Sequence, residues 1–218
     1  MKNKNIDNII EILRQEVQNF FTPIVTEVAN QSADPFKILI SCLLSLRTKD
    51  EVTTEASKRL FDLADTPEAM ARLSVEQIQK AIYPVGFYIT KAQRIKEICH
   101  ILIEKYNSKV PDKLDELLKL KGVGRKTANL VITLGYKKHG ICVDTHVHRI
   151  SNRLGLVKTR TPEQTEFALM EVLPKKYWII YNDLLVSYGQ NICRPISPLC
   201  SQCKIFEFCD RAGVTRSR

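Results

Sequence analysis

Residues 118–128 constrain the fold more than any other part of this chain, because they join two helical segments through a turn that contains two glycines. Leu114 and Leu117 belong to the first helical pattern, and a second pattern begins at Ala128. Gly122-Val123-Gly124 lies between the two patterns. Glycine adopts positive φ angles without steric cost and lets another backbone come close. The sequence therefore predicts a helix, a tight hairpin and a second helix.

This predicted hairpin is also positively charged. The turn exposes backbone N–H groups at the start of the second helix, where these groups and the helix dipole favour a bound anion. Two basic side chains flank the turn, so a DNA phosphate is its natural occupant. An ordinary helix corner with a glycine cap is the alternative, and the glycines alone do not exclude it. The DNA-binding residues predicted here are Lys121, Gly122, Val123, Gly124 and Arg125.

Composition favours a globular protein that binds a polyanion. The chain has 218 residues, of which 44% are hydrophobic, so it can bury a core and is not disordered. Its 33 Lys+Arg residues outnumber its 24 Asp+Glu residues, which gives a net charge of +9. Nucleic acid is the first candidate partner for such a charge.

The N-terminal sequence predicts no secretory signal, because no apolar core follows residues 1–4. The longest apolar run, residues 38–46, is too short for a membrane span of about 20 residues. We therefore expect a cytoplasmic protein, associated with the nucleoid if it is bacterial or archaeal, with no membrane partner.

Helix signals recur along almost the whole chain, and no segment alternates as a strand does. Asp34-Pro35, Thr66-Pro67 and Thr161-Pro162 each combine an N-cap residue with proline at the first helical position. Residues 74–77 form a capping box that opens a short helix ending at Ile82. The sequence therefore predicts an all-α protein of about ten helices.

Four of the seven cysteines gather near the end of the chain with the spacing C-x6-C-x2-C-x5-C. Thiolates so close together in a loop must share a metal. Zinc is the general alternative, although zinc ribbons usually have two C-x2-C pairs and this stretch has one. An iron–sulfur cubane also needs four thiolates. The candidate ligands are Cys193, Cys200, Cys203 and Cys209, whereas Cys42, Cys99 and Cys142 lie among apolar residues and are predicted to be buried thiols.

The motifs L-K-G-V-G-R-K-T-A-N and V-D-T-H-V-H-R resemble those of the helix–hairpin–helix DNA glycosylases, in particular their endonuclease III branch. The resemblance extends from Asp34 to Cys209. It implies a two-lobed all-α fold with a C-terminal iron–sulfur loop. A six-helix lobe with the hairpin would span residues 28–135, and residues 1–27 plus 136–218 would form the other. The cysteine spacing is that of the family's [4Fe–4S] loop, which makes iron–sulfur the expected cofactor.

The resemblance also implies two catalytic residues, because Lys126 matches the family's nucleophilic lysine and Asp144 its catalytic aspartate. A lysine attacks carbon only when its amine is neutral, and a helix N-terminus and the neighbouring Arg125 favour loss of the proton. Lys126 would attack C1′ of a flipped nucleotide and form a Schiff base. Asp144 would stabilise positive charge on the sugar or take a proton. A solvated lysine and a simple helix N-cap are the alternatives.

Further DNA contacts are expected where a flipped base leaves a gap in the duplex. Phe87 follows a glycine turn and suits a stacking wedge, although it could be a core aromatic; the family often has leucine there. Arg47 stands where the family commonly has glutamine, and Lys121 where it usually has proline. His146 would lie near the gap, and an ordinary packed or surface histidine is the alternative. Arg194 would contact a phosphate.

These features predict a monomeric enzyme that binds double-stranded DNA with a damaged base or an abasic site. Its expected activities are those of a DNA glycosylase that removes oxidised pyrimidines from duplex DNA and of an abasic-site lyase that acts by β-elimination. A monofunctional mismatch glycosylase is one alternative, which Lys126 disfavours because such relatives carry other residues there. A non-catalytic iron–sulfur DNA-binding module is the other.

Overall fold

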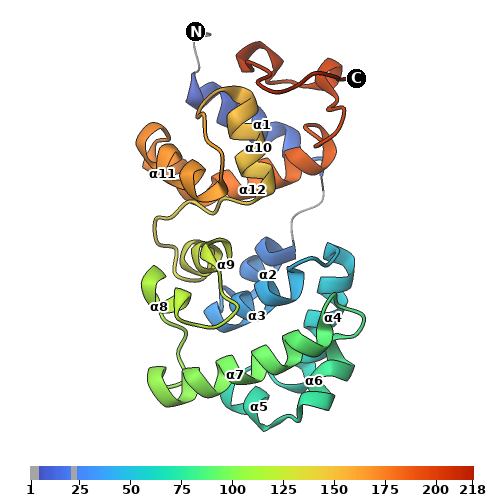
Figure 1. Cartoon of the computed structure of the whole chain (residues 1–218), viewed down its shortest axis with the longest axis vertical. Coiled ribbons are helices and arrows are strands. Elements are labelled where there is room, and N and C mark those ends of the chain that lie inside the picture. Colours follow the sequence, from blue (N-terminus) through green and yellow to red (C-terminus); the bar gives the residue numbers. More distant parts are fainter. Residues whose placement is uncertain (1–4, 21–23) are drawn as a thin grey trace. The chain divides into compact units, whose positions relative to one another are not determined.

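A computed structural model describes residues 5–20 and 24–218. Residues 1–4, on which the prediction about a secretory signal rests in part, lie outside the described residues, and so do residues 21–23 of the lobe segment 1–27. The described residues are helical with no strand, which confirms the all-α prediction (Figure 1). The α-helices are α1 (Ile6–Val17), α2 (Ile24–Ser32), α3 (Pro35–Ser45), α4 (Asp50–Leu63), α5 (Pro67–Arg72), α6 (Val75–Ile82), α7 (Tyr88–Tyr106), α8 (Leu114–Leu118), α9 (Arg125–Leu130), α10 (Thr145–Leu154), α11 (Pro162–Val172) and α12 (Trp178–Asn191).

The chain divides into two compact units. One unit consists of residues 24–138, and the other combines the described residues 5–20 with residues 139–218. The boundaries expected from the resemblance were 28 and 136. Where six helices were expected in the first unit, its described residues form eight, α2 to α9, of which three have no more than six residues.

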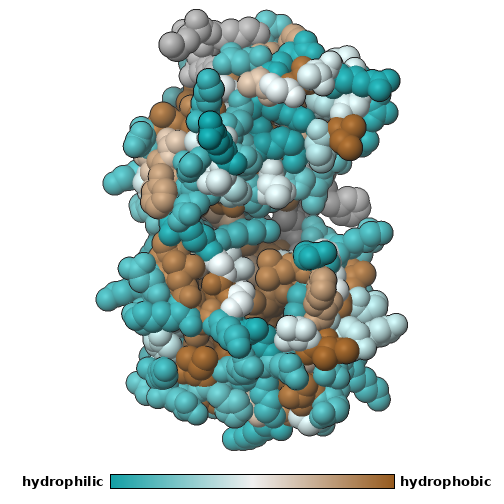
Figure 2. Space-filling model, viewed as in Figure 1, coloured by the Kyte–Doolittle hydropathy of each residue, from teal (hydrophilic) through white to brown (hydrophobic). Residues whose placement is uncertain are grey.

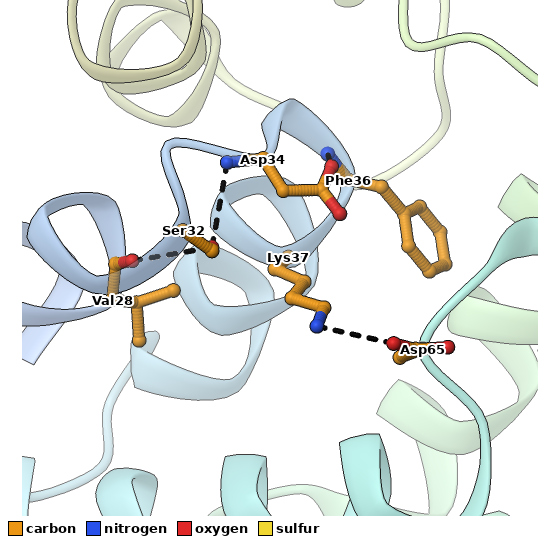
Figure 3. Close-up of polar contacts among 6 residues, drawn as sticks. All are labelled: Val28, Ser32, Asp34, Phe36, Lys37 and Asp65. Atoms are coloured by element: carbon orange, nitrogen blue, oxygen red, sulfur yellow. Dashed lines mark hydrogen bonds and ion pairs between the residues drawn. The ribbon is translucent and has the colours of Figure 1, made fainter.

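In the unit of residues 24–138, α3 and the long helix α7 organise the packing. Helix α7 contacts α3, α5 and α6, and α3 contacts α2, α4 and α9. Helix α3 is buried along most of its length, which its apolar sequence predicts. Polar contacts hold its start (Figure 3). Asp34 Oδ1 accepts a bond from Phe36 N at 2.8 Å, and Asp34 N donates to Ser32 Oγ, which in turn donates to Val28 O, at 3.4 Å each. Lys37 forms an ion pair of 3.2 Å with Asp65.

The other unit is built on α12, which packs against α1 and α10, while α11 packs on α10. Its core joins the apolar stripe of α1 to the apolar faces of α10 and α12. Tyr181 and Tyr188 are the largest side chains buried there, and Tyr181 exchanges a hydrogen bond of 3.1 Å with Ser151. The hydrogen-bonding end of each buried tyrosine is therefore satisfied inside the core.

The helix starts predicted from sequence are confirmed. The side chains of Asp34, Thr66 and Thr161 each accept a backbone N–H bond at the predicted N-cap, and both halves of the capping box at Ser74 are formed. The three remaining cysteines are buried as predicted.

Hydrophilic side chains cover most of the face drawn in Figure 2, with hydrophobic patches on the unit of residues 24–138. Within the described residues, no helix has both the length and the apolar character that a membrane crossing requires.

Candidate catalytic and DNA-binding site

The predicted hairpin lies between α8 and α9, and its two glycines serve different purposes (Figure 1). Gly122 has φ +89°, a conformation that L side chains rarely adopt, and a Cβ there would also press on the Arg94 side chain at 3.1 Å, so the backbone conformation favours glycine. Gly124 is the N-cap of α9 with φ −94°, and a Cβ there would meet no atom within 4 Å. The N-terminus of α9 is therefore open to an approaching ligand, with the exposed side chain of Lys121 beside it.

Lys126 lies in the first turn of α9 and is exposed, whereas the next four residues of the helix are buried. Helix α9 packs on α3, and the Lys126 charge acts on the buried thiol of Cys42 in that helix. Burial is the larger influence and raises the pKa of Cys42 to about 12, so this thiol stays neutral. The backbone of Lys126 thus belongs to a packed helix, while its side chain extends into solvent.

The helix that carries Lys126 continues into a π-helical turn, Val131–Gly135, that the sequence analysis did not predict. Thr133 Oγ1 donates to Asn129 O at 2.8 Å within this turn. A Cβ at Gly135 would lie 3.1 Å from Pro35 Cα, so the turn packs closely against the start of α3. Single π-turns are frequent near functional sites, and this one seats α9 on α3.

Asp144 belongs to the other unit and is the N-cap of α10, as its alternative interpretation required. Its Oδ1 atom accepts both cap bonds, from the N–H groups of His146 and Val147 at 2.9 Å each. The residue is only 8% exposed. No hydrogen bond to Oδ2 is seen within residues 5–20 and 24–218. The cap therefore fixes the carboxylate through one oxygen, which leaves the second oxygen for another partner.

The two histidines of H-x-H make separate contacts, in keeping with their different helix faces. His146 Nδ1 lies 3.1 Å from Arg149 NH2, and His148 Nδ1 lies 2.6 Å from Thr165 Oγ1 on α11. A Cβ at position 189 would lie 2.4 Å from His146 Nδ1, so Gly189 of α12 is needed for His146 to pack there. His146 is half-buried and held from two sides.

Arg47 and Phe87 are exposed residues of two loops in the unit of residues 24–138, so the core alternative for Phe87 is wrong. The Arg47 guanidinium lies over the Phe87 ring, with Cζ 4.8 Å from the ring centroid. No pattern in the sequence indicated that these residues, which are far apart in the chain, would touch.

All four candidate cysteine ligands line one pocket, which has about 320 Å³ of empty volume including open solvent. No three His, Cys, Asp or Glu side chains of the described chain converge closely enough to hold a single metal ion. Four thiol sulfurs that line one pocket form a donor set whose chemistry fits a group held by four thiolates. Three contacts converge on the sulfurs: Arg153 NH1 on Cys193 Sγ (3.4 Å), Tyr188 Oη on Cys203 Sγ (3.3 Å) and Arg211 N on Cys209 Sγ (3.4 Å).

Two arginines of α10 fasten the cysteine loop, and sequence reasoning missed both. Arg149 donates to Cys193 O at 2.8 Å, and Arg153 donates to Arg194 O and Pro195 O at 2.7 Å each. These contacts hold the Arg194 backbone while its side chain remains exposed. The only available sequence signal was their spacing of four residues, which places both on one face of a helix.

The structure brings the predicted residues together in two groups. Residues 24–138 carry the hairpin, Lys126, Arg47 and Phe87, and residues 139–218 carry Asp144, His146, Arg194 and the cysteines.

The fold and hairpin define an all-α helix–hairpin–helix protein, and comparisons with known proteins place it in base excision repair. The family model described as HhH-GPD superfamily base excision DNA repair protein matches residues 40–175. Endonuclease III of Thermotoga maritima is 52% identical over 181 residues, which cover 83% of this chain and 85% of that protein. An endonuclease III homologue of Arabidopsis thaliana is 45% identical, and the chain spans 49% of its length.

Solved structures give the same result. A non-covalent endonuclease III–DNA complex matches with a TM-score of 0.85 and 32% identity, covering 97% of this chain and 96% of that one. A trapped endonuclease III–DNA covalent intermediate, an estranged-adenine complex, matches with a TM-score of 0.77 and 37% identity, covering 82% and 84%. The chain belongs to the HhH-GPD superfamily of base excision DNA repair proteins, in its endonuclease III branch. Its enzyme class is that of a bifunctional DNA glycosylase and abasic-site lyase.

Proposed function

We propose that this enzyme removes oxidised pyrimidines from duplex DNA and then cleaves the strand at the abasic site. The observation that carries this proposal is the position of Lys126, an exposed amine in the first turn of a helix that begins at an open, positively charged hairpin. The hairpin would hold a backbone phosphate near that amine. The similar covalent endonuclease III–DNA intermediate supports a covalent course of reaction.

In the proposed reaction, neutral Lys126 Nζ forms a bond to C1′ of the extruded nucleotide, and the bond from C1′ to the damaged base breaks. The base leaves with the electron pair of that bond and a proton. The C1′–O4′ bond of the sugar then breaks, O4′ takes its electron pair and a proton, and the lone pair of Nζ forms the C1′=Nζ double bond of a Schiff base. Loss of a proton from C2′ then expels the 3′ phosphate by β-elimination. Asp144 stabilises positive charge developing on the sugar, or accepts the proton that Lys126 releases.

The cysteine pocket would hold a [4Fe–4S] cluster through Cys193, Cys200, Cys203 and Cys209. Burial raises the pKa of the Cys203 and Cys209 thiols, so these sulfurs need bound metal to remain as thiolates. When bound, the cluster cross-links the C-terminal loop and supplies no step of the sugar chemistry. Arg153 holds the same loop from α10 and keeps Arg194 exposed for a DNA phosphate.

Borohydride trapping tests the chemistry. Wild-type protein incubated with a duplex containing one abasic site and borohydride should form a covalent protein–DNA adduct, and Lys126→Gln should not. Lys119→Gln is the matched control, because Lys119 is an exposed lysine near the same hairpin that pairs with Glu116. Equal trapping by Lys126→Gln and wild type would contradict the assignment. Absence of any wild-type adduct would favour a non-catalytic DNA-binding module. We also infer that the enzyme works as a monomer on cytoplasmic DNA, within the nucleoid if the cell is bacterial or archaeal.

A further inference from the structure

Two loops of the unit of residues 24–138 are in direct contact. One is the α3–α4 loop, residues 46–49, and the other is the α6–α7 loop, residues 83–87. Gly86 N donates to Thr48 Oγ1 at 3.2 Å. A Cβ at Gly86 would lie 2.7 Å from Arg47 O, so any larger residue would push the loops apart. Glycine is therefore required at position 86 by the close approach of the second loop.

Arg47 and Phe87 each take a backbone conformation that non-glycine residues seldom adopt. Their φ angles are 56° and 59°. Such conformations persist only where the surroundings determine them, and they gather at functional sites. Here the strained residues are neighbours in space, the guanidinium lies over the ring, and Phe87 remains 59% exposed. The two side chains thus form one exposed stack supported from two loops.

Lys91, one turn into α7, joins both loops. Its backbone N–H donates to Phe87 O at 3.0 Å. Its ammonium donates to Leu44 O (2.8 Å), Leu46 O (2.6 Å) and Thr48 Oγ1 (3.2 Å). An ammonium has three N–H donors and no acceptor, so these three oxygens use all of them. The two carbonyls lie at the C-terminal end of α3, where helix carbonyls lack partners within the helix.

We propose that Lys91 is the positioning residue that holds Arg47 and Phe87 as one two-residue wedge, and that it thereby sets the preference for the base opposite the lesion. This inference rests on the proposed glycosylase function. The ring and the guanidinium plane offer a surface for stacking in the gap left by the flipped base. The guanidinium N–H groups pair with the O6 and N7 acceptors of guanine, whereas adenine offers only N7 as an acceptor on the same edge. The wedge therefore favours lesions opposite guanine.

The test compares excision of one oxidised pyrimidine opposite guanine and opposite adenine, as a ratio of single-turnover rates. In Lys91→Met this ratio should fall by about tenfold, the low end of one bidentate arginine contact. Lys91→Arg should restore much of it, because the guanidinium again donates to the loop. Lys96→Met is the matched control, since Lys96 also lies on α7 and donates to the carbonyl of a different loop, at Leu73.

Trapping at an abasic site is the companion measurement, because it reports on the reacting lysine without any base excision. Lys91→Met should still form the covalent adduct, and a complete loss of trapping would overturn the inference, since it would place the defect at the reacting lysine and not at the wedge. A guanine-to-adenine ratio that Lys91→Met leaves unchanged would overturn the inference, and so would an equal fall in Lys96→Met. A wild-type protein that neither excises nor traps refutes the proposed function instead, which separates the two failures.

Discussion

Asp144 offers a clear separation between a structural and a catalytic role, because one side chain is assigned both. Its Oδ1 atom accepts the two cap bonds of α10, each at 2.9 Å. Asparagine retains a side-chain oxygen and caps helices about as well as aspartate. The substitution Asp144→Asn therefore removes only the charge from the helix N-terminus, which costs about 0.3–1 kcal/mol. For a chain of this length, that lowers the melting temperature by about 1–4 °C.

Alanine at the same position removes the cap as well as the charge. Loss of an N-cap costs about 0.5–2 kcal/mol, so Asp144→Ala should melt below Asp144→Asn, up to about 8 °C under wild type. Both variants lose the carboxylate, and both should lose about 100-fold to 10,000-fold in base excision. The two substitutions thus differ in stability while they agree in activity.

The assay pairs thermal melting with single-turnover excision of an oxidised pyrimidine, at a temperature where every variant is folded. Thr161→Ala is the matched control, because Thr161 caps α11 in the same unit by accepting a bond from Gln164 N at 3.2 Å. It should lose a comparable amount of stability and keep its activity. The reasoning fails if Asp144→Asn retains more than about a tenth of wild-type excision, since that loss lies below the range for a proton-transfer group. It also fails if activity simply follows melting temperature across the three variants.

Three further outcomes are expected. Lys126→Gln should abolish borohydride trapping and shift the unfolding free energy by no more than about 0.5 kcal/mol, because the side chain is exposed; a large loss of stability would show a packing role. Cys203→Ser should lower the iron content and visible absorption of the purified protein, and full retention of iron would remove Cys203 from the ligand set. Burial lowers the pKa of Lys91 from 10.5 to about 8. The ammonium therefore holds the wedge below that pH, and a neutral amine with two donors replaces it above, so the guanine-to-adenine ratio should fall as pH rises past about 8. Arg47 and Lys49 are the charged residues of the loop that packs against Lys91. For Lys91→Arg we expect a guanine-to-adenine ratio that stays constant up to about pH 9.5. The same constant ratio in the wild-type protein would contradict the role of the Lys91 ammonium.

Features governed by contacts a few residues apart could be predicted from the sequence. The cap at Asp34 and the capping box at Ser74 each depend on atoms within three residues, and both formed where predicted. The hairpin and the buried cysteines follow from similarly local patterns. Helix α2 was not foreseen, and neither was the π-helical turn, which depends on close packing of Gly135 against Pro35. Periodicity carries no information about such packing.

The candidate site shows the same limit. Lys126 and Asp144 could be nominated because each stands in a short motif, but the contact between the loops of Arg47 and Phe87 could not. Lys91, which we propose to position both residues, looks like an ordinary helix lysine in the sequence, and only its bonds to three oxygens 43 to 47 residues away set it apart. Side chains that position others are therefore harder to find from sequence than side chains that react.

The chain's departures from its family's usual motifs lie in one class of residue. By the resemblance, Lys121, Arg47 and Phe87 stand where the family usually has other residues, and all three are exposed loop residues of the unit of residues 24–138. The residues assigned to bond breaking, Lys126 and Asp144, match the pattern. Each departure adds a charge or an aromatic surface where DNA would be contacted, and none alters a group that reacts. The reaction should therefore be that of the family, while the preferred opposite base and the salt dependence of binding should differ, because an added phosphate contact steepens the loss of affinity with salt.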